Sequence, residues 1–96
     1  MNRPLLSDYH TRVRGFATYD IALTAERSAR RWMKTAKRSG RATVTGGGWW
    51  KIEGWYQRVQ GYAALAIELR KRGHLDAVTG ELTEGGRAFA MEGGAR

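Results

Sequence analysis

The 96-residue chain contains no cysteine, and this absence excludes disulfide bonds, thiolate nucleophiles and zinc sites built on cysteine. Its two histidines, His10 and His74, stand alone in the sequence, and neither has a second ligand at a metal-binding spacing such as His-x-x-x-His. We therefore expect neither a metal nor any other cofactor.

Motifs of catalysis are missing as well. The chain has no Gly-x-Gly-x-x-Gly motif, and the glycines at 46–48 are not followed by the Lys-Ser or Lys-Thr pair of a phosphate-binding loop. The nine acidic residues show no paired arrangement suited to general acid and base catalysis. We therefore expect a protein that is not an enzyme.

Long hydrophobic runs are also lacking. The longest uncharged apolar run covers only residues 62–67, far short of the roughly 20 residues that cross a membrane. Residues 1–8 contain no apolar signal core. Hydrophobic residues nevertheless make up 42% of the chain, which argues against disorder. These features predict one soluble, cytoplasmic domain over residues 1–96, with a frayed tail at about 93–96.

Positive charge is what the chain has in excess, and it is unevenly distributed. The formal net charge is +8 and the sequence pI is about 10.6. Residues 1–41 hold ten Arg or Lys against three acids, a net charge of +7, whereas residues 42–96 hold seven against six, a net charge of +1. This imbalance favours one localised binding face over a generally basic surface.

Residues 27–41 concentrate the charge, because they contain seven basic residues and no acidic one. Five of the seven recur at intervals of three and four, which places them in one stripe on a helix. The members of this cationic stripe are Arg27, Arg30, Arg31, Lys34 and Arg38. Apolar residues with similar spacing fall on another side of the helix: Ala25, Ala29, Trp32, Met33 and Ala36. Glu26 is the only acid within the helix, so ion pairs along the helix do not explain the stripe.

Helical spacing predicts two helices in the first half of the chain. The first covers about residues 8–21 and the second about residues 25–39, with Thr24 as N-cap and Gly40 after the last turn. Because the apolar spacing continues in phase across Thr24, a single helix over residues 8–39 is the alternative.

Three consecutive glycines then interrupt the pattern, since glycine is unfavourable inside helices and strands. Alternating residues on both sides of them permit a β-hairpin over residues 41–53, but we favour a flexible loop there. The clearest helix is expected over residues 50–72, where apolar residues recur at steps of three and four and Gly73 follows three cations.

The last third of the chain changes character. Residues 75–82 predict two short strands around a tight turn, in which Asp76 caps the turn and Gly80 takes a positive φ. Thr83 is then the expected N-cap of a final short helix. The predicted fold class is therefore mainly α, with three to four helices and a small C-terminal β-hairpin.

The order of these last elements has a counterpart in a known family. A helix is expected to end at Arg72 and Gly73, two short strands follow, and residues 82–87 read Leu-Thr-Glu-Gly-Gly-Arg before the final helix. Residues 69–90 thus resemble the wing region of winged helix-turn-helix DNA-binding proteins, in which Leu-Thr-x-x-Gly-Arg opens the helix after the wing. That family joins its second and third helices by a short turn, whereas a longer glycine-rich segment stands here.

The resemblance implies a winged-helix variant that binds DNA. Residues 50–72 would be similar to the recognition helix of the family, and the cationic stripe would lie on the helix before it. That preceding helix more often contacts backbone phosphates than bases. The cations that the resemblance places near DNA are Arg58, Arg70, Lys71 and Arg72.

We expect a small basic DNA-binding protein, a transcription regulator or accessory factor, that contacts duplex phosphates through a cationic helix face. The expected contacts are Arg27, Arg30, Arg31, Lys34, Lys37, Arg38, Arg41, Lys51 and Arg58. Trp49 and Trp50 are adjacent and must point in different directions on a helix or strand. At least one of them is therefore expected to be exposed, as a stacking platform or as an anchor for a partner.

Two alternatives remain open. An acidic protein would also match the cationic stripe, as the partner of a phage- or plasmid-type inhibitor. RNA or single-stranded nucleic acid is the other, because exposed aromatic side chains stack on bases. A membrane surface is not expected as a partner, because the apolar face of the second helix is thin and rich in alanine. A homodimer would double the contact with DNA.

Overall fold

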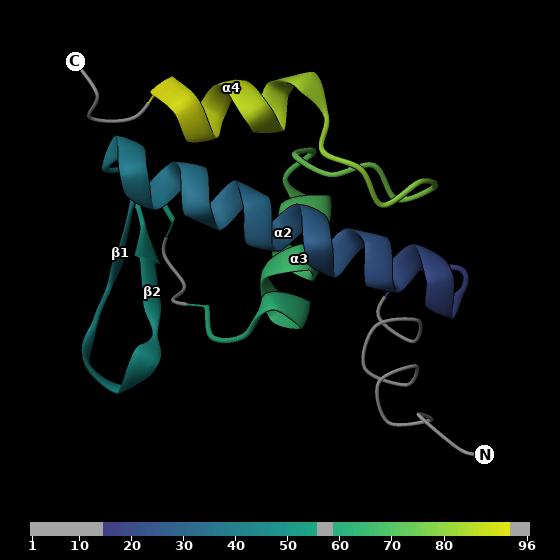
Figure 1. Cartoon of the computed structure of the whole chain (residues 1–96), viewed down its shortest axis with the longest axis horizontal. Coiled ribbons are helices and arrows are strands. Elements are labelled where there is room, and N and C mark those ends of the chain that lie inside the picture. The colour runs from purple at the N-terminus through teal and green to yellow at the C-terminus, as the bar shows by residue number, and fades with distance from the viewer. Residues whose placement is uncertain (1–14, 56–58, 93–96) are drawn as a thin grey trace.

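The computed structural model describes residues 15–55 and 59–92 of the chain (Figure 1). These residues form three α-helices and one antiparallel sheet of two strands. In chain order the elements are α2 (Tyr19–Ser39), β1 (Ala42–Val44), the 3-10 turn η1 (Gly46–Gly48), β2 (Trp50–Ile52), α3 (Tyr62–Lys71) and α4 (Glu84–Glu92). The prediction of a mainly helical fold with a small hairpin is confirmed, but the hairpin stands in the middle of the chain and not near its end.

The long helix α2 is the central element of the fold. Figure 1 shows α4 lying along one side of it and the β1–β2 hairpin on the other, with α3 crossing behind it. Its apolar back is buried as predicted, in contact with all of these neighbours. The buried residues of that back are Ala22, Ala25, Ala29, Trp32, Met33 and Ala36. The small alanines let neighbouring elements approach closely, while Trp32 and Met33 fill the space between them.

The start of α2 differs from both sequence-based alternatives. Its N-cap is Thr18, whose hydroxyl accepts a hydrogen bond from the Ile21 amide at 3.1 Å. Residues 15–18 are not helical, so a single helix over residues 8–39 is wrong. The predicted start at residue 25 is also wrong, because Thr24 lies inside the helix and donates its hydroxyl to a backbone carbonyl. Of the helix predicted over residues 8–21, the part before Gly15 lies outside the described residues.

The β1–β2 hairpin replaces the flexible loop that we favoured from the sequence. Ala42 pairs with Ile52, and Val44 pairs with Trp50, with the glycine turn η1 between the strands. On its other edge Trp50 exchanges two backbone hydrogen bonds with Val59, at 2.9 and 3.2 Å. The amide and carbonyl of Trp50 are thus used in sheet pairing and not in a helix.

The prediction of one helix over residues 50–72 is therefore wrong, and α3 begins only at Tyr62. Gly61 precedes it with φ 89° and ψ 145°, a backbone conformation that ends any helix arriving from the N-terminal side. Leu65 and Leu69 of α3 are fully buried against α2. Residues 56–58 of the predicted helix, which include Arg58, lie outside the described residues.

The turn predicted at residues 75–82 is present, but its two strands are not. A single antiparallel bridge joins Leu75 to Leu82. The Asp76 carboxylate accepts the amides of Val78 and Thr79 at 2.7 and 3.1 Å, which confirms its role as the cap of the turn. The amides of Val78 and Thr79 bond to this carboxylate and not to a facing strand, so the segment between Leu75 and Leu82 is a loop.

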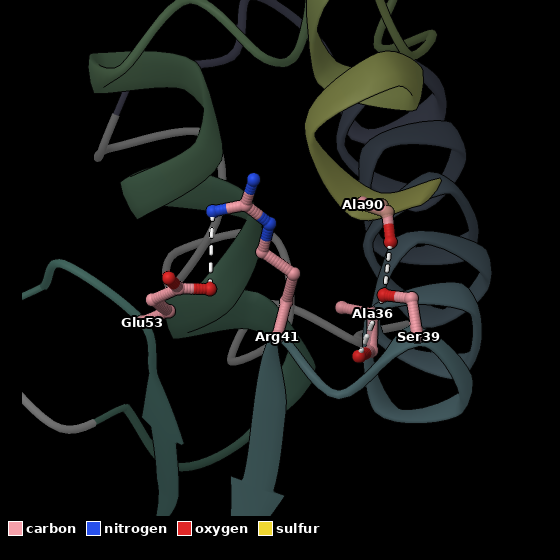
Figure 2. A network of polar contacts seen from close by, with 5 residues as sticks. All are labelled: Ala36, Ser39, Arg41, Glu53 and Ala90. Atoms are coloured by element: carbon pink, nitrogen blue, oxygen red, sulfur yellow. Dashed lines mark hydrogen bonds and ion pairs between the residues drawn. The ribbon is translucent and has the colours of Figure 1, made fainter. Parts of the chain in front are cut away.

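The final helix begins as predicted. The Thr83 hydroxyl accepts the amide of Gly86 at 3.0 Å, which is the expected N-cap bond. At the other end of α4, the Ser39 hydroxyl donates to the carbonyl of Ala90 and also lies 3.2 Å from the carbonyl of Ala36 (Figure 2). This hydroxyl joins the last turns of α2 and α4. None of the helices in the described part of the chain has the apolar length that a bilayer crossing requires.

Candidate nucleic-acid interface

Six cations of α2 form one continuous exposed surface, which we call the cationic face. Its members are Arg27, Arg30, Arg31, Lys34, Lys37 and Arg38. At 3.6 residues per turn these positions fall within roughly a third of the helix circumference. The buried back of α2 lies opposite, so the packing of α3 and α4 aims all six side chains toward solvent. This places together every residue that the sequence assigned to the stripe, and it adds Lys37.

The cationic face is not neutralised by the rest of the described chain. Among the side chains of residues 15–55 and 59–91, carboxylates form ion pairs with Arg41 and Arg72 but with none of the six cations of the face. The nearest acid in the sequence, Glu26, is half-buried on the flank of the helix. Six like charges on one side of a helix repel one another, and this repulsion is relieved by solvent ions or by a polyanion.

One cation of the face is held in place by an aromatic ring. The guanidinium carbon of Arg30 lies 4.3 Å from the centre of the Tyr62 ring, at the start of α3. The Tyr62 ring in turn contacts the ring of Trp50 in β2, with 4.8 Å between their centres. This chain of contacts attaches the hairpin to the edge of the cationic face.

The other predicted contacts lie elsewhere. Arg41 is half-buried, and one of its terminal nitrogens lies 3.2 Å from the Glu53 carboxylate (Figure 2). Its guanidinium carbon lies 4.1 Å from the centre of the Phe89 ring. These contacts join the hairpin to α4 and leave Arg41 off the cationic face. Lys51 is exposed on β2, on the hairpin face that it shares with Thr43. Arg58 is outside the described residues.

The two adjacent tryptophans divide between surface and core, as their alternation on a strand requires. The exposed fraction of Trp49 is 38% and that of Trp50 is 8%, so the expectation that at least one is exposed is confirmed. Trp50 packs inward on Tyr62, whereas Trp49 follows the glycine turn at the tip of the hairpin. Of the two, Trp49 is the candidate for contact with a partner.

A groove runs between α2 and α4, beside the cationic face. Its volume is about 330 Å³, and cations from both helices line it: Arg31, Lys34 and Arg38 from α2, and Arg87 from α4. Its apolar lining consists of Trp32, Leu82, Ala90 and Met91. We did not include Arg87 among the sequence-based contacts, although it is the last residue of the Leu-Thr-x-x-Gly-Arg pattern. Its position beside α2 depends on how α4 packs, which the local pattern does not specify.

His74 has an aromatic environment. Its ring lies between those of Trp32, Trp55 and Phe89, with centres 5.9, 6.3 and 4.9 Å away. Burial, and secondarily the positive charge of Arg72, lower the pKa of His74 below its usual value of 6.5. The described residues contain no group of three or more side chains that could hold a metal ion. His74 is therefore part of the packing between α2, α3 and α4.

Comparisons of the chain with protein-family models, with curated proteins and with solved structures found no match.

Proposed function

We propose that the protein binds double-stranded DNA through the cationic face of α2. The observation that carries this proposal is the exposure of six cations on one side of a helix, with no ion pair to a carboxylate in the described residues. Duplex DNA is a dense polyanion, and Arg and Lys that neutralise its phosphates release condensed counterions, which drives binding. We propose no catalytic activity, and we place the protein in the cytoplasm as a regulator or accessory factor.

The dimensions of the face fit a duplex. Residues 27–38 extend over about 16 Å at 1.5 Å per residue. A duplex carries one negative charge per roughly 1.7 Å of its axis, so several phosphates lie within reach of a face of this length. Contacts to phosphates orient a protein on the duplex but carry no sequence information. The cationic face is therefore expected to bind many duplex sequences with similar affinity.

The hairpin is the proposed second contact. Lys51 lies on its exposed face and Trp49 at its tip, and the Tyr62 ring connects the hairpin to Arg30 of the cationic face. The wing resemblance of residues 69–90 stays a prediction. The N-cap at Thr83 and the turn at Asp76 agree with it, whereas the hairpin of the described chain stands before α3.

The test is a titration of a fluorescent duplex with the full chain over a series of salt concentrations. If about five phosphates are neutralised, the logarithm of the binding constant should fall against the logarithm of salt concentration with a slope near −4.5. No binding at low salt, or a slope near zero, contradicts the proposal. Single-stranded DNA and duplex RNA of the same length are the comparison ligands, and stronger binding to either one transfers the proposal to that ligand.

A further inference from the structure

The groove between α2 and α4 has a lining that phosphate binding does not explain. Four cations stand around it, but its remaining surface is mostly apolar, and the exposed fraction of Met91 is 62%. A DNA duplex offers phosphates at its surface and no aliphatic side chain to bury. An occupant that matches both parts of the lining combines negative charges with an exposed apolar group.

One segment of this same chain has that combination. Residues 75–86 contain three acids, Asp76, Glu81 and Glu84, and no basic residue. Val78 stands between the first two of these acids, and its exposed fraction of 76% is the highest among the large hydrophobic residues of the described chain. We call residues 76–84 the acidic loop.

The acidic loop is held in a defined conformation. Its base is attached to α2 by the buried Ser28 hydroxyl, which donates to the Gly80 carbonyl at 2.7 Å. Its tip is fixed by the Asp76 carboxylate, which accepts the amides of Val78 and Thr79. A loop that is already ordered loses little conformational entropy when it docks, which favours its use as a binding element.

We propose that a second copy of this chain docks its acidic loop in the groove. The loop and the groove are neighbours, because Leu82 belongs to the loop and also lines the groove. Two copies related by a two-fold axis can therefore exchange both contacts at once, and two-fold dimers are the commonest symmetric assemblies. In the dimer Val78 packs on Met91, and the acids of the loop face Arg38 and Arg87.

The dimer also bears on DNA binding, since each of its chains carries a cationic face, in which Arg38 meets the acidic loop of the other chain and the other five cations stay available to phosphates. This consequence depends on the proposed function, whereas the dimer itself does not. Sedimentation without DNA and titration with duplex therefore test the two proposals separately.

The experiment is analytical ultracentrifugation of the full chain over a concentration series at physiological ionic strength. The wild-type chain should form a dimer that dissociates on dilution. Val78→Ser and Met91→Ser should each raise the dissociation constant by about a hundredfold or more, because each substitution removes one buried apolar side chain from both contacts of the two-fold dimer. Both residues are exposed in the single chain, so the circular dichroism of the variants should match the wild type.

A mixture of the two variants gives the sharpest result. A dimer with one chain of each kind retains one unaltered contact, from the loop of the Met91→Ser chain to the groove of the Val78→Ser chain. The mixture should therefore associate more tightly than either variant alone. Val44→Ser is the matched control, because Val44 is 55% exposed on the hairpin, away from loop and groove, and its replacement should leave the dimer unchanged.

Three outcomes overturn the proposal. A chain that stays monomeric at every concentration leaves the groove to some other acidic ligand. A dimer that Val78→Ser and Met91→Ser do not weaken uses another surface. A mixture that associates no better than the separate variants excludes the pairing of loop with groove.

Discussion

The guanidinium group of Arg30 lies over the ring of Tyr62, with 4.3 Å between the guanidinium carbon and the ring centre. Arg30 belongs to the cationic face and Tyr62 to the first turn of α3, so this contact links the proposed DNA-binding surface to the core. A cation held on a ring has less rotamer freedom to lose when it meets a phosphate. The Tyr62 ring therefore orients Arg30 before any phosphate is bound.

Removal of the Tyr62 ring should affect stability. Tyr62→Leu loses the contact with Arg30 and the contact with Trp50, and the free energy of unfolding should fall by about 1–2 kcal/mol. Tyr62→Phe keeps both ring contacts and should stay close to the wild type. Urea denaturation followed by circular dichroism measures both variants. Equal losses for Leu and Phe would assign the effect to the hydroxyl and not to the ring.

Replacement of three cations tests the cationic face directly. The triple variant Arg27→Ala, Arg30→Ala and Arg31→Ala should bind every duplex sequence more weakly, and the magnitude of its salt slope should fall by about 2.7. The matching triple Lys variant keeps the charge and should keep the slope. Fluorescence anisotropy over a salt series measures both. A triple Ala variant with the wild-type slope would show that DNA is bound elsewhere.

Gly80 should resist substitution. Its φ is 78°, and an added Cβ would lie 2.7 Å from the carbonyl oxygen of Ile21. Gly80→Ala should therefore lower the free energy of unfolding by about 1–3 kcal/mol. Gly85 is the control, since a Cβ there meets only one heavy atom, at 4.0 Å, and alanine is the better helix former by up to about 1 kcal/mol. Gly85→Ala should leave the free energy of unfolding unchanged or raise it. Thermal melts of both variants and the wild type provide the measurement.

The pH dependence of stability should follow His74. Its pKa is lower in the folded chain than in the unfolded chain, so the unfolded state binds the proton more readily. The free energy of unfolding should therefore fall as the pH drops below about 6.5 and should be insensitive to His74 at higher pH. His74→Phe should flatten the profile between pH 7 and the folded pKa. Denaturant titrations at several pH values provide the measurement, and an unchanged profile in the variant would contradict this assignment.

The two faces of α2 were predictable because they depend on positions three and four residues apart. Spacing alone placed Trp32 and Met33 inside and the cationic stripe outside. The start of the helix was not predictable in the same way, since Thr18 and Thr24 are both capable N-caps. In the structure the backbone of Thr18 is extended and the helix starts at the next residue, so Thr18 is the N-cap and Thr24 is not.

The region after residue 49 shows where local pattern fails. Ile52, Trp55 and Val59 are spaced as on one face of a helix, and the same spacing is compatible with a strand, a turn and a second bridge. The choice was made by pairing across the hairpin and by the backbone of Gly61, neither of which appears in the apolar pattern. The pairing of Arg41 with Glu53 depends on that register and could not be predicted before the hairpin was known.

The groove could not be predicted from the sequence, because it is formed by two helices that are far apart in the chain. Arg87 meets Arg31 and Lys34 only because α4 packs along α2, with Thr83 setting where α4 begins. The sequence marked Thr83 as a cap but did not specify the direction of the helix that follows it.

The hydroxyl of Ser39 holds α2 and α4 together at one end of the groove without contributing to the lining of the groove. It lies within hydrogen-bond distance of the main-chain carbonyls of Ala36 and Ala90, so α4 is held to α2 at that end by Ser39 whatever side chains stand at positions 36 and 90. Met91 and Arg87, by contrast, supply the lining through their side chains alone. The frame and the chemistry of the groove are therefore separable, and descendants of this chain could acquire new binding preferences without rebuilding the scaffold.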